Sequence, residues 1–378
     1  MRTASMAHLK RRQLGVSLVE LMIALLIGLV VTGGLVAVLT ATRQAFTIQQ
    51  GNNANQESSR FANARLAWSL RMADFWGGIK PTAITTTTSV TGLGGSGDCT
   101  GAWVVSVGPT GQNGLRGYKG GSDFPITNCV DPANYVKNSD VVVVRYADTR
   151  GYDPAKASSA LPAFDSTTPG AVPNRTSVFI LAAIEQTGTI FRQGASVPSN
   201  PLGSTAGRYV YPFQFEMYYL RPCADPGADG VCGTTDDGDD KANPQPSLVR
   251  MRMDTSGALV SETVIEGIEQ MQLEYAPPAG AFQAADKVSS FDAITQVRVG
   301  LVTRAQARDV SQPHPGDFTV LGHCVYSVST AGAITYGTAS SGTNQCSGSP
   351  AANYGDKPQQ FTRLVSTQVV VLRNRVRG

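Results

Sequence analysis

Residues 15–39 read GVSLVELMIALLIGLVVTGGLVAVL, and this stretch decides how the chain is built. The nineteen residues 21–39 carry no charge. At about 1.5 Å per residue they would form a helix about 28 Å long, which matches the hydrocarbon core of a bilayer. The segment therefore predicts one membrane-spanning helix near the N-terminus.

Charges around this segment indicate its orientation. Lys10, Arg11 and Arg12 precede the apolar run, while only Arg43 follows it closely. The positive-inside rule then places the N-terminus in the cytoplasm and the rest of the chain across the membrane. A cleaved secretory signal is a poorer fit, because the apolar run is long and residues 39–41 make a weak cleavage site.

Glu20 is unexpected in a simple membrane anchor, because an ionisable side chain entering hydrocarbon costs a few kcal/mol. The surrounding residues 10–28, KRRQLGVSLVELMIALLIG, resemble the N-terminus of type IV prepilins. That family has a basic leader, a glycine cleaved on its C-terminal side, an apolar first mature residue and a glutamate at the fifth mature position. Val16 departs from the phenylalanine that is usual at the first mature position.

The resemblance implies specific chemistry at these residues. Prepilin peptidase would cleave after Gly15 and methylate the amine of Val16, which keeps its positive charge. In a fibre, Glu20 of one subunit would then pair with the cationic N-terminus of a neighbour, since both groups are costly alone in an apolar bundle. An alternative from another class is an uncleaved anchor carrying a periplasmic binding protein or adhesin that does not polymerise.

The helix is expected to continue beyond the membrane. No proline occurs before Pro81, and Gly77 and Gly78 supply a stop signal. An amphipathic face is predicted from side chains at helical spacing: Phe61, Arg65, Trp68, Met72 and Phe75. We therefore expect one helix from about Val16 to Trp76. The predicted division is a leader (1–15), a transmembrane and polymerisation helix (16–42), its amphipathic continuation (43–78) and a β-rich periplasmic body (79–378).

The body carries short β-branched and aromatic runs with period-two patterning. They lie at 103–107, 141–146, 177–182, 209–220, 248–253, 297–301 and 365–371. Such runs predict an antiparallel sheet with one buried face, which the amphipathic half of the helix would cover. The fold class is therefore α+β and pilin-like. Arg373, Arg375 and Arg377 alternate at the end of the last run, as at a solubilising strand end.

The C-terminal third of the chain resembles one group within the type IV prepilins. Residues 264–275, 294–304 and 361–375 resemble the closing strands of PilW-type minor pilins, with the type II secretion pseudopilin J as the alternative. The resemblance implies a minor pilin that helps to initiate a type IV pilus and forms its tip. Implied partners are other minor pilins, the major pilin, the inner-membrane assembly platform, prepilin peptidase and, in some complexes, a tip adhesin.

Six cysteines lie outside the apolar segment, which suits disulfides in an oxidising compartment such as the periplasm. Pairing of sequence neighbours is the simplest of the fifteen possible connectivities. It would join Cys99 to Cys129, Cys223 to Cys232, and Cys324 to Cys346.

Beyond disulfides, one loop has the composition of a metal site. Residues 223–240 are rich in glycine and carry six carboxylates, at Asp225, Asp229, Asp236, Asp237, Asp239 and Asp240. Hard oxygen ligands on a flexible loop suit Ca²⁺, although the spacing matches no EF-hand and solvated acidic loops are common. We expect no other cofactor.

Enzymes and nucleic-acid binders are not expected. The chain has three histidines and no nucleophile-elbow or zincin motif, so no catalytic set can be recognised. Without its leader the chain has 27 basic and 28 acidic residues, so it lacks the basic excess that nucleic-acid binding requires.

Overall fold

The chain divides into two compact units, Met1–Gln50 and Gly51–Gly378. A computed structural model describes residues 15, 17–86, 90, 93, 95, 97–107, 114–154, 177–183, 186–192, 207–239, 243–310, 313–336 and 356–376.

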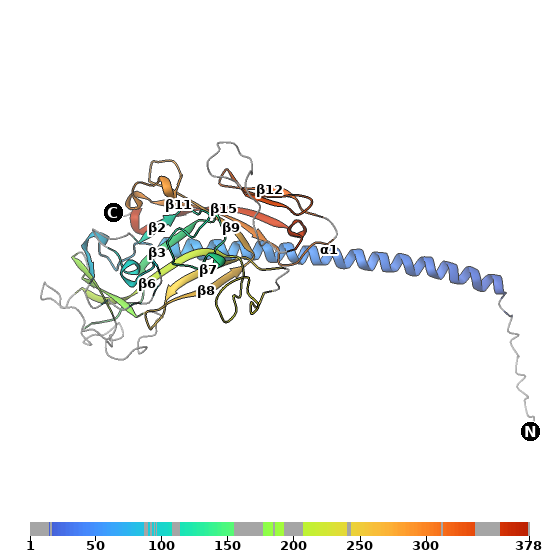
Figure 1. Ribbon diagram of the computed structural model, residues 1–378, viewed down its shortest axis with the longest axis horizontal. Helices are drawn as coiled ribbons and strands as arrows, with labels where there is room; N and C mark the ends of the chain where they lie inside the picture. The colour runs from blue at the N-terminus through green and yellow to red at the C-terminus, as the bar shows by residue number, and fades with distance from the viewer. Residues whose placement is uncertain are drawn as a thin grey trace, which may run out of the picture. The chain divides into compact units, whose positions relative to one another are not determined.

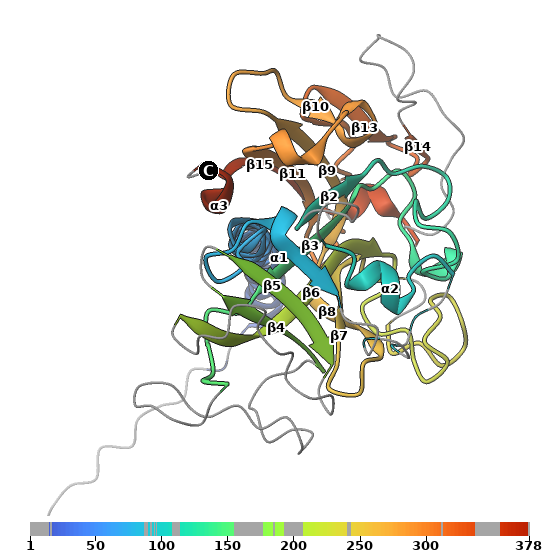
Figure 2. The same ribbon diagram turned by 90° about the vertical axis from the view of Figure 1, so that its left-hand side faces the viewer.

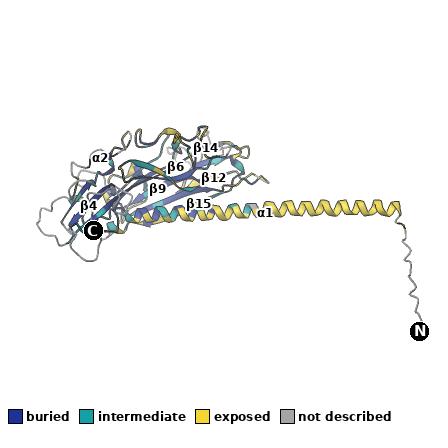
Figure 3. Ribbon diagram, turned by 90° about the horizontal axis from the view of Figure 1, so that it is seen from below, coloured by how far each residue is buried: buried dark blue, intermediate teal, exposed yellow. Residues whose placement is uncertain are grey.

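Helix α1 spans Leu18–Met72 and confirms the predicted long helix (Figure 1). By length and composition it is the one helix in the described residues that could cross a membrane. Its apolar side chains between residues 18 and 46 are exposed (Figure 3). The helix ends four residues before Trp76, at Met72, because Asp74 takes a left-handed φ of 59° two residues later.

The largest sheet has eight strands, and all its pairs are antiparallel except the parallel pair β1 and β5. Its path is β1-β5-β4-β6-β3-β2, with β7 added on β6 and β8 on β7. The strands are Ile84–Thr86 (β1), Leu115–Tyr118 (β2), Val141–Ala147 (β3), Val178–Ala183 (β4), Thr187–Arg192 (β5), Arg208–Arg221 (β6), Ser247–Met253 (β7) and Leu259–Glu266 (β8).

Two smaller antiparallel sheets complete the second unit, in the orders β10-β9-β11-β15 and β12-β13-β14. Their strands are Ile268–Ala276 (β9), Gln283–Ala284 (β10), Gln296–Arg304 (β11), Gly316–Val320 (β12), His323–Val328 (β13), Ile334–Tyr336 (β14) and Arg363–Val371 (β15). Short helices lie at Gly101–Val104 (α2) and Arg373–Val376 (α3), with 3-10 turns at Pro81–Ala83, Pro132–Asn134, Ala285–Lys287, Phe291–Ala293 and Pro358–Gln360.

The second half of α1 packs where the eight-stranded and four-stranded sheets face each other (Figure 2). Its buried apolar side chains are Ala62, Leu66, Ala67 and Leu70, and the buried Ala73 follows directly after the helix. They contact Val142, Val144 and Tyr146 from one sheet and side chains of β9, β11 and β15 from the other. This arrangement confirms the α+β class and the predicted packing of the helix on the body.

The predicted amphipathic face is wrong in its detail. Phe61 and Trp68 remain 50% and 47% exposed, whereas Met72 and Phe75 are partly buried against the core. The reason is side-chain size. Alanines allow the helix to pack closely against two sheets, whereas a tryptophan at the same place would keep the helix away from the sheets. The rings of Trp68 and Tyr146 instead form a T-shaped pair, and the guanidinium of Arg65 lies 4.9 Å from the centre of the Trp68 ring.

Three further expectations about the body are corrected. The centre of the eight-stranded sheet has no polar face, because every residue of β3 and of β4 is buried. Residues 101–104 form helix α2 rather than a strand, since Thr100 accepts a hydrogen bond from the Trp103 amide as its N-cap. The run at 264–275 is broken at Gly267, where φ of +82° carries the chain from β8 of one sheet to β9 of another.

Candidate assembly site

The N-terminal motif lies at the beginning of α1. Gly15 is exposed, and a Cβ built on it would meet no atom within 4 Å. Glu20 is exposed in the first turn of α1, where a carboxylate is favoured by the helix dipole. Val16 lies outside the described residues, so cleavage, methylation and the Glu20 contact remain predictions.

Polar side chains within the apolar part of α1 are satisfied by their own helix. The hydroxyl of Thr32 donates to the Gly28 carbonyl at 2.7 Å, and that of Thr42 donates to the Val38 carbonyl at 2.8 Å. Thr40 bonds the Val36 carbonyl in the same way, at 3.0 Å. All three hydroxyls are therefore hydrogen-bonded within the helix, so this part of the helix suits an apolar environment.

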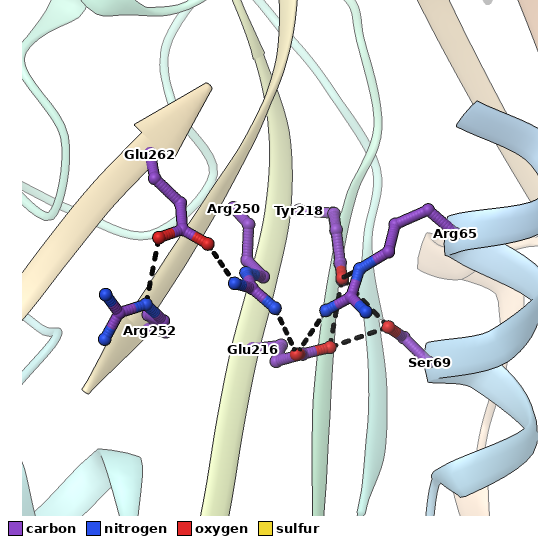
Figure 4. A network of polar contacts seen from close by, with 7 residues as sticks. All are labelled: Arg65, Ser69, Glu216, Tyr218, Arg250, Arg252 and Glu262. Atoms are coloured by element: carbon purple, nitrogen blue, oxygen red, sulfur yellow. Dashed lines mark hydrogen bonds and ion pairs between the residues drawn. The ribbon is translucent and has the colours of Figure 1, made fainter. Parts of the chain in front are cut away.

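A polar network fastens the second half of α1 to the eight-stranded sheet (Figure 4). Glu216 of β6 is buried and pairs with Arg65 of α1 at 2.7 Å and with Arg250 of β7 at 2.9 Å. It also accepts hydrogen bonds from Ser69 at 2.6 Å and from Tyr218 at 3.0 Å. Burial raises the pKa of Tyr218, so the hydroxyl stays protonated as a donor.

The network continues outward from Arg250, which also pairs with Glu262 of β8. Arg252 contacts the same carboxylate at 3.0 Å. Burial alone would raise the pKa of Glu262, but hydrogen bonds from both arginines lower it overall. The chain of contacts therefore runs from the helix through three adjacent strands.

The C-terminal segment closes the end of α1. The Asn374 amide donates to the carbonyls of Met72 and Ala73 at 3.4 and 3.0 Å, which are groups that a helix leaves unpaired at its end. Arg375 pairs with Asp74, whose other oxygen accepts the Gly114 amide at 2.7 Å. The predicted solubilising strand end is therefore wrong for Arg375, which is largely buried; Arg377 lies outside the described residues.

A second buried network joins the two smaller sheets. The carboxylate of Glu269 is fully buried and pairs with Arg363 at 2.6 Å and with Arg304 at 3.4 Å. Tyr326 of β13 donates to it at 2.5 Å. Burial opposes ionisation, yet the two arginines lower the pKa of Glu269 below its ordinary value. Neither network was found by sequence analysis, because the partners are far apart in the chain.

Two of the three predicted disulfides are confirmed. Cys99 is bonded to Cys129 and Cys223 to Cys232, with Cα atoms 5.2 and 5.7 Å apart. The first bond tethers the segment that carries α2 to the loop before β3, beside the core of the eight-stranded sheet. Cys346 of the third predicted pair lies outside the described residues.

The aspartate-rich loop shows carboxylates engaged with the loop backbone. Asp239 accepts the amides of Ala224 and Asp225 at 2.8 and 3.0 Å, and Asp236 accepts the amide of Ala228 at 2.8 Å. Asp225, Asp229 and Asp237 each accept one loop amide as well. No group of three or more metal-ligating side chains is found in the described part of the chain, which excludes Asp240. Calcium binding therefore remains a prediction.

Two regions of the chain match known families. Residues 10–36 match the prokaryotic N-terminal methylation motif, and residues 235–374 match Type IV Pilus-assembly protein W. The second match runs from the aspartate-rich loop through β7–β15 to α3 and so contains both smaller sheets. Comparison with curated proteins and with solved structures gave no match.

Proposed function

Because the chain is a type IV prepilin-like protein of the PilW type, we propose that it is a minor pilin that helps to initiate a pilus and forms its tip. Its N-terminal helix anchors it in the inner membrane before assembly. The partners would be other minor pilins, the major pilin, the assembly platform and prepilin peptidase.

One observation carries this proposal. A helix with an exposed apolar first half begins within the residues that match the methylation motif. The second half of the same helix is fastened by ion pairs to a body whose residues 235–374 match a pilus-assembly family. A soluble protein would bury such a surface, whereas a subunit that passes from bilayer to fibre needs it exposed in both places. The periplasmic orientation is supported by the basic leader and the two disulfides.

The first experiment tests processing. The full chain is co-expressed with prepilin peptidase, and the intact mass and N-terminal sequence are determined beside those of Gly15→Leu. We expect a product that begins at methylated Val16 and is absent from the variant. An uncut wild-type chain would refute the proposed class and leave an anchored protein that does not polymerise.

The second experiment tests assembly. Glu20→Ala should be processed normally but recovered with other pilins at about a tenfold lower yield, which corresponds to about 1.4 kcal/mol. Glu57→Ala removes another exposed acid of α1, outside the apolar run, and is the matched control. Labelling of the protein at filament ends would support the tip position, and even labelling along filaments would contradict it.

A further inference from the structure

β15 is an edge strand among the described residues. It is the last strand of the four-stranded sheet and pairs only with β11 among the described strands (Figure 2). The amide of Leu372 donates to Thr295, and that of Ala305 donates to Thr362. Antiparallel pairing alternates, so even-numbered residues of β15 bond to β11. The N–H and C=O groups of Val365, Thr367, Val369 and Val371 therefore point to the free edge.

This edge lacks the features that normally prevent strand addition. Residues 364–372, LVSTQVVVL, contain no charge and no proline, and all nine pairs between β11 and β15 keep one register without a bulge. The side chains of Val365, Val369 and Val371 are 38%, 50% and 49% exposed. A long, regular and apolar edge is a template for another strand.

Other edges of the described sheets are protected. β8, the far edge of the eight-stranded sheet, carries Glu262 and Glu266 and has an irregular register with β7. The edge strands β1, β2, β10 and β14 have only two to four residues each. The edge strand β12 has five residues and an irregular register with β13. The free edge of β15 is therefore a local feature and not a general property of this fold.

A groove runs beside the same strand. It is lined by α1 and β15, with Gln56, Ser59, Arg60, Asn63, Ala64, Leu364, Ser366 and Gln368. Ser59 and Asn63 bond the Ser366 hydroxyl at 2.9 Å, and Gln368 donates to the Asn63 carbonyl at 2.6 Å. These contacts hold the helix beside β15, and the small side chain of Ala64 leaves room at the groove.

We propose that β15 and this groove receive a single extended segment of another pilus subunit, which adds a fifth strand to the four-stranded sheet. This inference rests on the proposed function. A second copy of this chain is a poorer occupant, because its own α1 would accompany its β15 and compete for the space at the edge. Arg60 is the one charged residue in the groove, so the segment should be uncharged or carry a carboxylate near Arg60.

The test uses the full chain co-expressed with prepilin peptidase and the other prepilin-like subunits of its own system, purified in detergent alone and in complex. Hydrogen exchange should show about four further protected amides in peptide 363–372 of the complex, those of Val365, Thr367, Val369 and Val371. Peptide 259–266, which covers the protected edge β8, should be unchanged. Unchanged exchange of peptide 363–372 in an intact complex would overturn the proposal.

Substitution and cross-linking complete the test. Val369→Lys should keep the melting temperature and lower the yield of complex about tenfold, whereas Ser261→Lys on β8 should leave the yield unchanged. A photoreactive p-benzoylphenylalanine at position 367 should cross-link to an extended segment of a different subunit. Cross-linking to a second copy of this chain, or a normal yield with Val369→Lys, would overturn the proposal. Failure of the wild-type chain to form any complex would instead refute the proposed function, and this inference with it.

Discussion

Replacing Glu216 should loosen α1 from the eight-stranded sheet far more than replacing Glu262. Only 4% of the Glu216 side chain is exposed, and it holds two arginines and two hydroxyls from α1, β6 and β7. Breaking a buried pair costs about 3–5 kcal/mol. Arg65 and Arg250 are 23% and 16% exposed and can regain some hydration, so we expect about 2–3 kcal/mol for Glu216→Gln.

The matched control is Glu262→Gln, which removes a carboxylate from the outer end of the same network. Its side chain is 33% exposed, so the expected loss is below about 1 kcal/mol. Thermal unfolding of the full chain in detergent should place the melting temperature of Glu216→Gln about 4–8 °C below that of wild type, with the control within about 2 °C. Exchange of amides in residues 59–70 should rise only in Glu216→Gln.

Equal destabilisation by the two variants would refute this reasoning. It would mean that Arg65 and Arg250 are stabilised by the whole cluster of charges and not mainly by the buried carboxylate of Glu216. A double-mutant cycle with Arg65→Leu and Glu216→Gln measures the interaction of Glu216 with the helix apart from its interaction with the neighbouring strand. The coupling energy between Arg65 and Glu216 should exceed about 1 kcal/mol if the two side chains form the ion pair described above.

Two further predictions concern the body. Removal of the Cys99–Cys129 bond, which closes a loop of 30 residues, should lower the free energy of unfolding by about 1 kcal/mol more than removal of Cys223–Cys232, which closes 9, because a bond that closes a longer loop removes more entropy from the unfolded chain. Urea unfolding of the two double-alanine variants measures the difference. The reverse order would contradict the entropic argument. The pKa of Glu269 is lowered from 4.5, so its stabilisation is complete above that value and is lost as pH falls through the lower folded pKa. The melting temperature should therefore fall from about pH 5 to about pH 3, and less steeply in Glu269→Gln; equal slopes would show that other carboxylates control acid unfolding.

Much of the chain could be predicted from local pattern. The uncharged run at 21–39, the absence of proline before Pro81 and the glycines at 77–78 predicted one long helix to about Trp76, and α1 ends four residues earlier, at Met72. Period-two runs predicted β3, β4, β6, β7, β11 and β15 with small errors at their ends. These features depend on neighbouring residues only, and so does the N-terminal motif around Gly15 and Glu20.

The local sequence pattern did not predict which side chains are buried where one helix packs against two sheets, or where one sheet ends and the next begins. The stripe containing Phe61 and Trp68 has the spacing of a core face, yet alanines nearby occupy the core because two sheets approach the helix there. Gly267 interrupts a run that reads as one strand, and only strand pairing shows that β8 and β9 belong to different sheets.

The sequence by itself determined a membrane-length helix, a prepilin-like N-terminus and a β-rich body, because each depends on short segments. It left the pairing of the cysteines open among fifteen connectivities, of which neighbour pairing was the simplest. Only the tertiary structure decided which face of α1 is buried, how Glu216 reaches Arg65 and Arg375 reaches Asp74, and which of the described strands lie at the edges of the sheets. The physical reason is that strand order and ion-pair partners depend on residues up to 301 positions apart, and no local periodicity encodes them.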